Sequence, residues 1–288
     1  MTVLVTGGDG QVGRAVARYV PARHSAIVIP HAELDIGNAA AVTEALQASG
    51  AEWIVNAAAY TAVDRAESEP ELARAINDTA VGVLAGAARE CGCRLLHLST
   101  DFVFDGQSNR PYLPTDPTSP LSVYGATKLA GERQALDAGC EAIVLRTAWV
   151  YASAGRNFAL TMLKLMRERA EVRVVADQIG TPTWAGGIAQ AIWGLISQEA
   201  PAGIHHWTDL GVASWYDFAV AIQDEALARG ILDRAVAIVP ITTPDYPTPA
   251  RRPSFSVLDT SATRALTPAP ARHWRHQLRR MFDELQAQ

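Results

Sequence analysis

The chain has 288 residues, 49% of them hydrophobic, which is enough for one large α/β domain and a smaller one. Its formal net charge is −5 and its 25 basic residues are scattered, so we expect no nucleic-acid partner, because binding a phosphate backbone requires clustered positive charge. We find neither a secretory leader nor a run of about 18 uninterrupted apolar residues, so we expect a cytoplasmic protein with no membrane partner.

In the first half of the chain, short apolar β-branched runs alternate with longer segments of helical period, which indicates βαβ units and a parallel sheet. The predicted strands are residues 3–5, 26–29, 53–55, 94–98 and 142–146, and the predicted helices are 12–20, 39–48, 71–89 and 122–138. After Thr147 the alternation breaks into a helix at 158–168, a short strand at 172–175 and a less periodic remainder.

This pattern predicts the α/β class, with a doubly wound parallel sheet (a Rossmann fold) and a smaller C-terminal α/β substrate-binding domain. We place the Rossmann domain at residues 1–146. The substrate-binding domain is expected mainly in residues 147–288, with some of its elements returning to the Rossmann domain. The Pro-dense stretch 240–253 is expected to be an ordered loop.

A glycine-rich turn follows the first predicted strand. Gly7, Gly10 and Gly13 stand in a Gly-x-x-Gly-x-x-Gly spacing that leads directly into a helix. Gly7 suits a tight turn, Gly10 lets the backbone approach a pyrophosphate, and Gly13 allows close packing of helix on strand. Glycine turns also simply connect elements, but the position between strand and helix favours a dinucleotide site that includes Gln11 and Val12.

Further cofactor contacts are expected where the next strands end. After the second strand, Pro30 and His31 replace the acid that would accept from a ribose 2′-hydroxyl. A missing carboxylate removes repulsion against a 2′-phosphate, so we expect NADPH, with NADH as the alternative. His31 is either a neighbour of that phosphate or only a surface residue. Asp35 and Ile36 are expected on the adenine side. The remaining expected contacts are Ala57, Ala59, Tyr60, Thr61 and Leu98.

Tyr124 and Lys128 form the candidate catalytic pair, since a spacing of four residues places both on one helical face. A neighbouring ammonium is expected to lower the pKa of the phenol, and the same Lys can bind ribose hydroxyls of a nicotinamide cofactor. Tyr-x-x-x-Lys alone is common, but Thr100 at the end of the fourth strand adds a hydroxyl that can polarise a carbonyl. Together these features predict hydride transfer to a ketone, with Tyr124 as the proton donor.

Longer motifs extend along almost the whole chain. They lie at residues 10–13, 56–64, 66–70, 99–104, 119–125, 128–132, 146–151, 157–158, 177–183 and 246–253. As a set they resemble the dTDP-4-dehydrorhamnose reductases of the extended short-chain dehydrogenase superfamily. The resemblance implies that NAD(P)H reduces the 4-keto group of dTDP-4-dehydro-β-L-rhamnose to dTDP-L-rhamnose, so the partner would be a small nucleotide sugar.

The resemblance also implies roles for individual residues. The family's catalytic positions are matched by Thr100, Tyr124 and Lys128, and positions near the substrate by Asp101, Trp149, Asn157 and Arg252. A guanidinium suits the geometry of a nucleotide diphosphate, although an Arg between prolines is more often a surface residue. Trp149 could alternatively belong to the core.

Metal binding is not expected. Some members of the family are magnesium-bridged dimers that use an acidic residue just after the glycine turn, where this chain has Ala15. The three cysteines lack Cys-x-x-Cys spacing and are read as small buried hydrophobic residues. Monomer and homodimer both stay open.

Three other functions share parts of this pattern. A nucleotide-sugar dehydratase would show Asp-Glu after its Thr, whereas Asp101 is followed by Phe102. A 4-epimerase is disfavoured by the overall resemblance. A non-catalytic regulatory subunit of methionine adenosyltransferase shares much of the pattern and would bind a partner protein instead.

Overall fold

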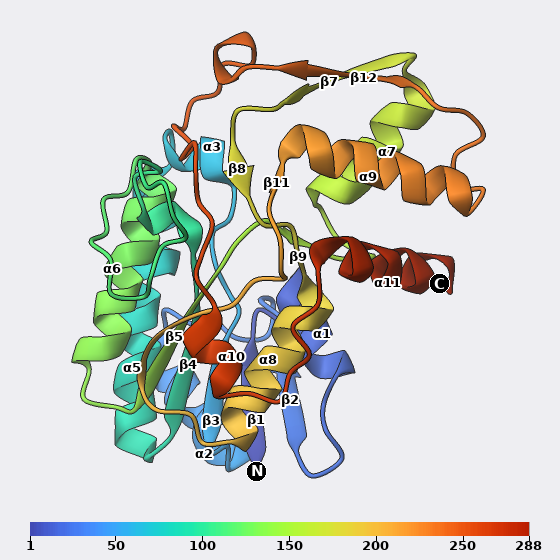
Figure 1. Ribbon diagram of the computed structural model, residues 1–288. Coiled ribbons are helices and arrows are strands. Elements are labelled where there is room, and N and C mark those ends of the chain that lie inside the picture. The colour runs from blue at the N-terminus through green and yellow to red at the C-terminus, as the bar shows by residue number, and fades with distance from the viewer. Residues whose placement is uncertain (288) are drawn as a thin grey trace.

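The computed structural model describes residues 1–287 and centres on a six-stranded parallel sheet (Figure 1). The strand order is β10-β5-β4-β3-β1-β2, and every neighbouring pair is parallel. Because the chain winds outwards in both directions from β1 and β3, the sheet is doubly wound, which confirms the predicted fold class. The strands are β1 (Thr2–Thr6), β2 (Ser25–Ile29), β3 (Trp53–Asn56), β4 (Arg94–Thr100), β5 (Ala142–Thr147) and β10 (Gly203–His206).

Helices cover both faces of this sheet (Figure 1). Side chains alternate along β1, so Val3 and Val5 pack in one apolar cluster and Leu4 in the other. The first cluster lies under α1 and α8, and the second under α2, α5 and α6. The helices are α1 (Gln11–Arg18), α2 (Ala39–Ser49), α5 (Ala80–Cys91), α6 (Val123–Asp137) and α8 (Ala185–Ser197).

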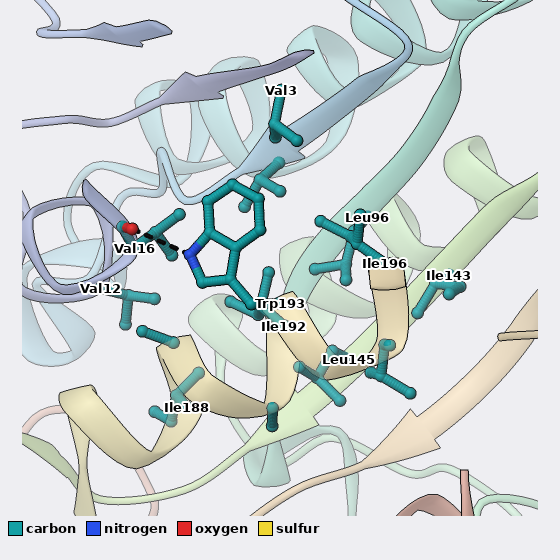
Figure 2. Packing of buried hydrophobic residues seen from close by; sticks show 14 of the residues in the cluster. Val3, Val12, Val16, Leu96, Ile143, Leu145, Ile188, Ile192, Trp193 and Ile196 are labelled. Carbon is teal, nitrogen blue, oxygen red and sulfur yellow. Dashed lines mark hydrogen bonds between the residues drawn. The ribbon is translucent and has the colours of Figure 1, made fainter. Parts of the chain in front are cut away.

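Trp193 of α8 shows how the first layer is fixed. Its indole nitrogen donates to the carbonyl oxygen of Val16 at 2.9 Å, while its ring lies among the apolar side chains of the sheet (Figure 2). Most side chains of α8 are buried. The helix therefore lacks the amphipathic period that a sequence pattern needs, which is why α8 was not predicted. The following β10 was not predicted either. Both follow residue 147 and lie in the Rossmann layers.

A second apolar core lies in the C-terminal part of the chain, beside the carboxyl edge of the sheet (Figure 1). Here β12 pairs with β7 in parallel, and three helices pack around them. β12 reaches Ile241, so the Pro-dense stretch begins inside a strand rather than in a loop. The elements are α7 (Phe158–Glu168), β7 (Glu171–Val175), α9 (Trp215–Ala228), β12 (Ala237–Ile241) and α11 (Trp274–Gln286).

Short elements connect the two parts. Two-residue strands pair as β6 with β9 and β8 with β11. Their bounds are β6 (Val150–Tyr151), β8 (Ile179–Gly180), β9 (Thr183–Trp184) and β11 (Ala213–Ser214), and the short helices are α3 (Val63–Ala66), α4 (Pro70–Arg74) and α10 (Ser261–Ala265). Within residues 1–287, no helix is long and apolar enough to cross a bilayer.

Candidate active site

The glycine turn after β1 is built by close backbone contacts. Gly7 has a φ of 69°, and a Cβ on it would lie 2.5 Å from the nitrogen of Ala58. A Cβ on Gly13 would lie 2.2 Å from the carbonyl oxygen of Gly7, so α1 can start here only with glycine at this position. Gly10 differs, because its Cβ would meet only one protein atom within 4 Å, the Gly7 oxygen at 3.2 Å.

The amino terminus of α1 is suited to an anion. Gly10 caps the helix without a side-chain hydrogen bond, and the first turn holds no acidic residue. The first backbone N–H groups of a helix point outward and carry partial positive charge, so a pyrophosphate fits here. These observations make the turn compatible with the dinucleotide that the sequence predicts.

The other expected cofactor residues differ in what their side chains can offer. His31 is exposed after β2, and Thr61 is exposed after β3. Asp35 accepts from the backbone nitrogen of Gly37 at 2.9 Å, and Ile36 is only 6% exposed within an apolar cluster, so its side chain serves the core. Ala57, Ala59 and Tyr60 are half-buried, and the Tyr60 hydroxyl donates to Glu69 at 2.6 Å.

Thr100, Asp101 and Tyr124 meet at the carboxyl end of β4. The Thr100 hydroxyl donates to Asp101 Oδ1 at 3.1 Å. Burial raises the pKa of Asp101 to about 6, against hydrogen bonds from Ser256 and Thr100 that lower it. Burial also raises the pKa of Tyr124 to about 12, opposed by a hydrogen bond with Thr100 and reinforced by the Asp101 charge.

Helix α6 approaches this strand end closely. A Cβ on Gly125 would lie 2.3 Å from the carbonyl oxygen of Phe102, so a glycine is required beside Tyr124. The Phe102 ring meets the Tyr124 ring edge-on, with centroids 5.6 Å apart. The Ser122 hydroxyl accepts from the Gly125 nitrogen at 3.2 Å and starts the helix there.

Lys128 is buried one turn further along α6. Its Nζ donates to the carbonyl oxygen of Leu98 at 2.6 Å and lies 3.3 Å from His97 Nε2. Burial lowers the pKa of Lys128 to about 8, while Glu132 raises it. The expectation that this ammonium lowers the pKa of the phenol is wrong for this structure, because burial of Tyr124 dominates.

Glu132 and Arg146 form a buried ion pair behind the site, each with 2% of its side chain exposed. The pair is bidentate, with Nε to Oε1 at 2.8 Å and Nη2 to Oε2 at 2.7 Å. Ser99 also donates to Oε1, at 2.5 Å. Sequence reasoning missed His97 and Glu132. The available signal was a lone histidine inside the apolar run of β4 and an acid one turn after Lys128.

Trp149 follows β5 by two residues and has a strained backbone conformation. Its φ is 47°, in the left-handed region that non-glycine residues rarely adopt. Its ring stacks on Trp215, with centroids 3.5 Å apart and planes at 4°. A Cβ on Gly180 would lie 2.5 Å from the Trp149 ring, so this glycine makes room for the stack.

Asn157 and Arg252, both expected near the substrate, lie in different surroundings. Asn157 caps α7 and donates to Gln11 Oε1 at 3.0 Å, beside the glycine turn. Arg252 pairs with Asp64 at 2.8 Å and donates to Thr248 Oγ1 at 2.6 Å. In this structure its guanidinium therefore ties the Pro-rich loop to α3. Within residues 1–287, no group of three or more His, Cys, Asp or Glu residues could hold a metal ion.

A Rossmann sheet with this glycine turn, and with Thr, Tyr and Lys at one strand end, defines the class of extended short-chain dehydrogenases. The family model for the RmlD substrate binding domain matches residues 1–287. The chain is 42% identical over 286 residues to dTDP-4-dehydrorhamnose reductase of Burkholderia thailandensis, covering 96% of each. It is 40% identical over 293 residues to that of Escherichia coli K12, covering 99% of this chain and 98% of the relative. The chain therefore belongs to the dTDP-4-dehydrorhamnose reductase family, as its motifs indicated.

Solved structures agree with this assignment. The dTDP-4-dehydrorhamnose reductase of Clostridium acetobutylicum matches with a TM-score of 0.93 and 36% identity, covering 99% of this chain and 100% of that one. The enzyme of Bacillus anthracis, solved in complex with NADP, matches with a TM-score of 0.91 and 32% identity, covering 98% of this chain and 99% of that one. A UDP-glucose 4-epimerase of Thermus thermophilus, at 19% identity, covers 99% of each chain and shares the fold at a TM-score of 0.79.

Proposed function

We propose that this protein reduces the 4-keto group of dTDP-4-dehydro-β-L-rhamnose, giving dTDP-L-rhamnose at the expense of NADPH. One observation carries the proposal: in a chain of this family, Thr100, Asp101 and Tyr124 converge at the sheet edge that also carries the glycine turn. The names of the relatives supply the substrate, and the NADP complex of the Bacillus anthracis enzyme supplies the cofactor.

The residues of the sheet edge would hold the cofactor. The amino terminus of α1, which Gly10 caps without a side chain, suits the pyrophosphate, and Lys128 suits the ribose next to the nicotinamide. His31, exposed directly after β2, would be the neighbour of a ribose 2′-phosphate. When bound, the reduced nicotinamide supplies a hydride to the ketone carbon of the sugar.

Side chains of the protein supply the proton that the new hydroxyl group needs. With its pKa raised to about 12, Tyr124 is protonated at neutral pH, so it donates to the carbonyl oxygen that becomes the hydroxyl. Thr100, whose hydroxyl donates to Asp101 in this structure, would turn that hydrogen to the same oxygen and stabilise its developing negative charge. The charged form of Lys128, one turn further along α6, would partly offset the effect of burial by favouring the phenolate that Tyr124 leaves behind.

Phe102 argues against an elimination reaction at this site. Loss of water from the sugar needs a second acid–base group next to the Thr–Tyr pair. In this chain the position after Asp101 carries an apolar ring that packs against Tyr124. The site therefore favours simple reduction over dehydration.

Purified protein mixed with dTDP-4-dehydrorhamnose and NADPH is expected to consume the reduced cofactor, followed by its absorbance, and to form one dTDP-rhamnose per hydride. The KM for NADPH should lie below that for NADH, because Pro30 and His31 stand directly after β2 in place of the acid that would accept from a ribose 2′-hydroxyl. Consumption of NADPH without rhamnose formation, or no consumption at all, would overturn the proposed function.

Gly180→Ala tests whether the Trp149 stack belongs to the sugar site. The new Cβ would lie 2.5 Å from the ring, so Trp149 must leave its stack on Trp215. We expect the KM for the nucleotide sugar to rise about 10-fold or more, with the KM for NADPH unchanged. Gly86→Ala is the matched control, since nothing lies within 4 Å of its added Cβ. Equal kinetics for both variants would remove Trp149 from the site.

A further inference from the structure

A chain of buried polar side chains runs across three neighbouring strands to Lys128. The Thr6 hydroxyl at the end of β1 donates to Asn56 Oδ1 at 2.7 Å. Asn56, at the end of β3, contacts His97 Nδ1 through its Nδ2 at 3.0 Å. His97 Nε2, on β4, lies 3.3 Å from Lys128 Nζ. Thr6, Asn56 and His97 are each at most 1% exposed, so water does not compete for these contacts.

The orientation of the Asn56 amide follows from one backbone group. The Ala58 backbone nitrogen, which can only donate, contacts Asn56 Oδ1 at 3.1 Å. Asn56 Nδ2 is therefore the donor towards His97, and His97 Nδ1 must accept. An imidazole that accepts at Nδ1 cannot be doubly protonated, so His97 is neutral and carries its hydrogen on Nε2.

In this tautomer a hydrogen-bond donor of His97, its Nε2–H group, faces Nζ of Lys128. A charged ammonium can also only donate, so the two groups cannot form a hydrogen bond, and their partial positive charges repel each other. One Nζ hydrogen is accepted by the Leu98 carbonyl oxygen at 2.6 Å, on the same strand as His97. The neutral amine, in contrast, has a lone pair that can accept from Nε2–H. The contact from β4 thus favours the uncharged form of Lys128.

Three other charged groups lie near Lys128, on α6, on β5 and at the end of β4. Glu132, on the next turn of α6, attracts the ammonium and raises the pKa of Lys128. Both of its oxygens are engaged by Arg146 of β5, and Ser99 donates to one of them, so its charge is largely compensated. Asp101 faces Tyr124 and Thr100 at the strand end. His97 is the titratable group of β4 that contacts Nζ directly.

We propose that His97 is a positioning residue for the reductase: held by Asn56 as its Nε2–H tautomer, it directs Lys128 towards the Leu98 carbonyl and makes its ammonium easy to deprotonate. The catalytic consequence rests on the function proposed above. Because the charged form of Lys128 assists Tyr124, the rate should fall at a lower pH than an ordinary lysine would allow. Burial lowers the pKa of Lys128 in the same direction.

The tautomer is tested on the unmodified protein by NMR with ¹⁵N-labelled histidine, assigning His97 by comparison with His97→Leu. We expect one neutral imidazole with a protonated Nε2 and no titration around neutral pH, since burial and the Lys128 charge hold the pKa of His97 well below its usual value. A protonated Nδ1, or a charged ring near neutral pH, would overturn the proposal. This measurement needs no turnover, so it is independent of the proposed function.

The effect on Lys128 is tested with Asn56→Asp. The carboxylate has nearly the same shape but can only accept, so His97 must turn its hydrogen to Nδ1 and offer a lone pair to Lys128. We expect the alkaline limb of the pH profile of kcat/KM, where the rate falls, to move to a pH about one unit higher. In the double variant with His97→Leu, most of this shift should disappear. A shift that survives there would come from the new charge alone and would overturn the relay through His97.

His205→Leu is the matched control. His205 is also buried, in β10 of the same sheet, but its Nε2 contacts the backbone carbonyl oxygen of Pro201 at 2.9 Å. Loss of this ring should leave the alkaline limb where it is. A limb that moves as far as in Asn56→Asp would show that the pH dependence follows general loosening of the sheet, against the proposal.

Discussion

Replacing Tyr124 with Phe is expected to lower kcat by about 10³-fold while leaving the affinity for NADPH nearly unchanged. The phenol is the group that can give a proton to the new hydroxyl oxygen, and its raised pKa of about 12 keeps that proton in place at neutral pH. The ring itself packs edge-on against Phe102, a contact that Phe retains. The variant therefore removes only the hydroxyl oxygen, and the ring that remains still fills its place beside Phe102.

The measurement is single-turnover reduction with bound NADPH, together with a titration of NADPH by fluorescence. Tyr112→Phe serves as the control, because its hydroxyl donates to Asp105 at 2.8 Å, away from Thr100, and should leave kcat nearly unchanged. If Tyr124→Phe turns over as fast as the unmodified protein, another acid delivers the proton and the proposed mechanism is wrong. A large loss of NADPH affinity would instead point to a structural role for the hydroxyl.

Arg146→Met is expected to have the largest effect on stability, lowering the free energy of unfolding by about 3–5 kcal/mol. Arg146 and Glu132 are both 2% exposed and joined by two hydrogen bonds. Met fills much of the same volume, but it leaves the Glu132 carboxylate buried without its cation. Ser99 alone, donating at 2.5 Å, cannot replace a bidentate guanidinium.

Urea unfolding followed by circular dichroism measures this loss, and activity at low temperature shows whether the surviving fold still positions Lys128. Lys164→Met is the control, because the Lys164–Glu168 pair is largely exposed with its charges 4.0 Å apart, and such pairs contribute little. Similar unfolding midpoints for the two variants would show that the buried pair does not support the sheet edge.

The fold was predictable wherever local pattern and tertiary environment agree. Apolar strands and amphipathic helices follow each other through the first half of the chain, and the predicted helix 122–138 includes the observed α6 with its two capping residues. The pattern failed at α8 and β10. A helix buried on nearly all sides has no polar face, and a four-residue strand with two histidines carries too little signal.

Most site residues that the sequence singled out stay predictions, but the structure separates them by environment. Thr100 and Tyr124 meet because β4 ends where α6 begins, and both of these elements were predicted. The pKa of the phenol could not be predicted from its lysine neighbour, since burial depends on everything packed around α6. Arg252 was expected near a diphosphate, and only the folded loop shows its pairing with Asp64.

The sequence by itself determined the class of fold, the glycine turn and the family, because each depends on short-range spacing along one strand, turn or helix. Only the tertiary structure decided the electrostatics of the site. His97, Asn56 and Thr6 lie on three different strands, 41 and 50 residues apart along the chain in successive contacts. Their contact depends on the order and register of the sheet, and neither is encoded in any single segment.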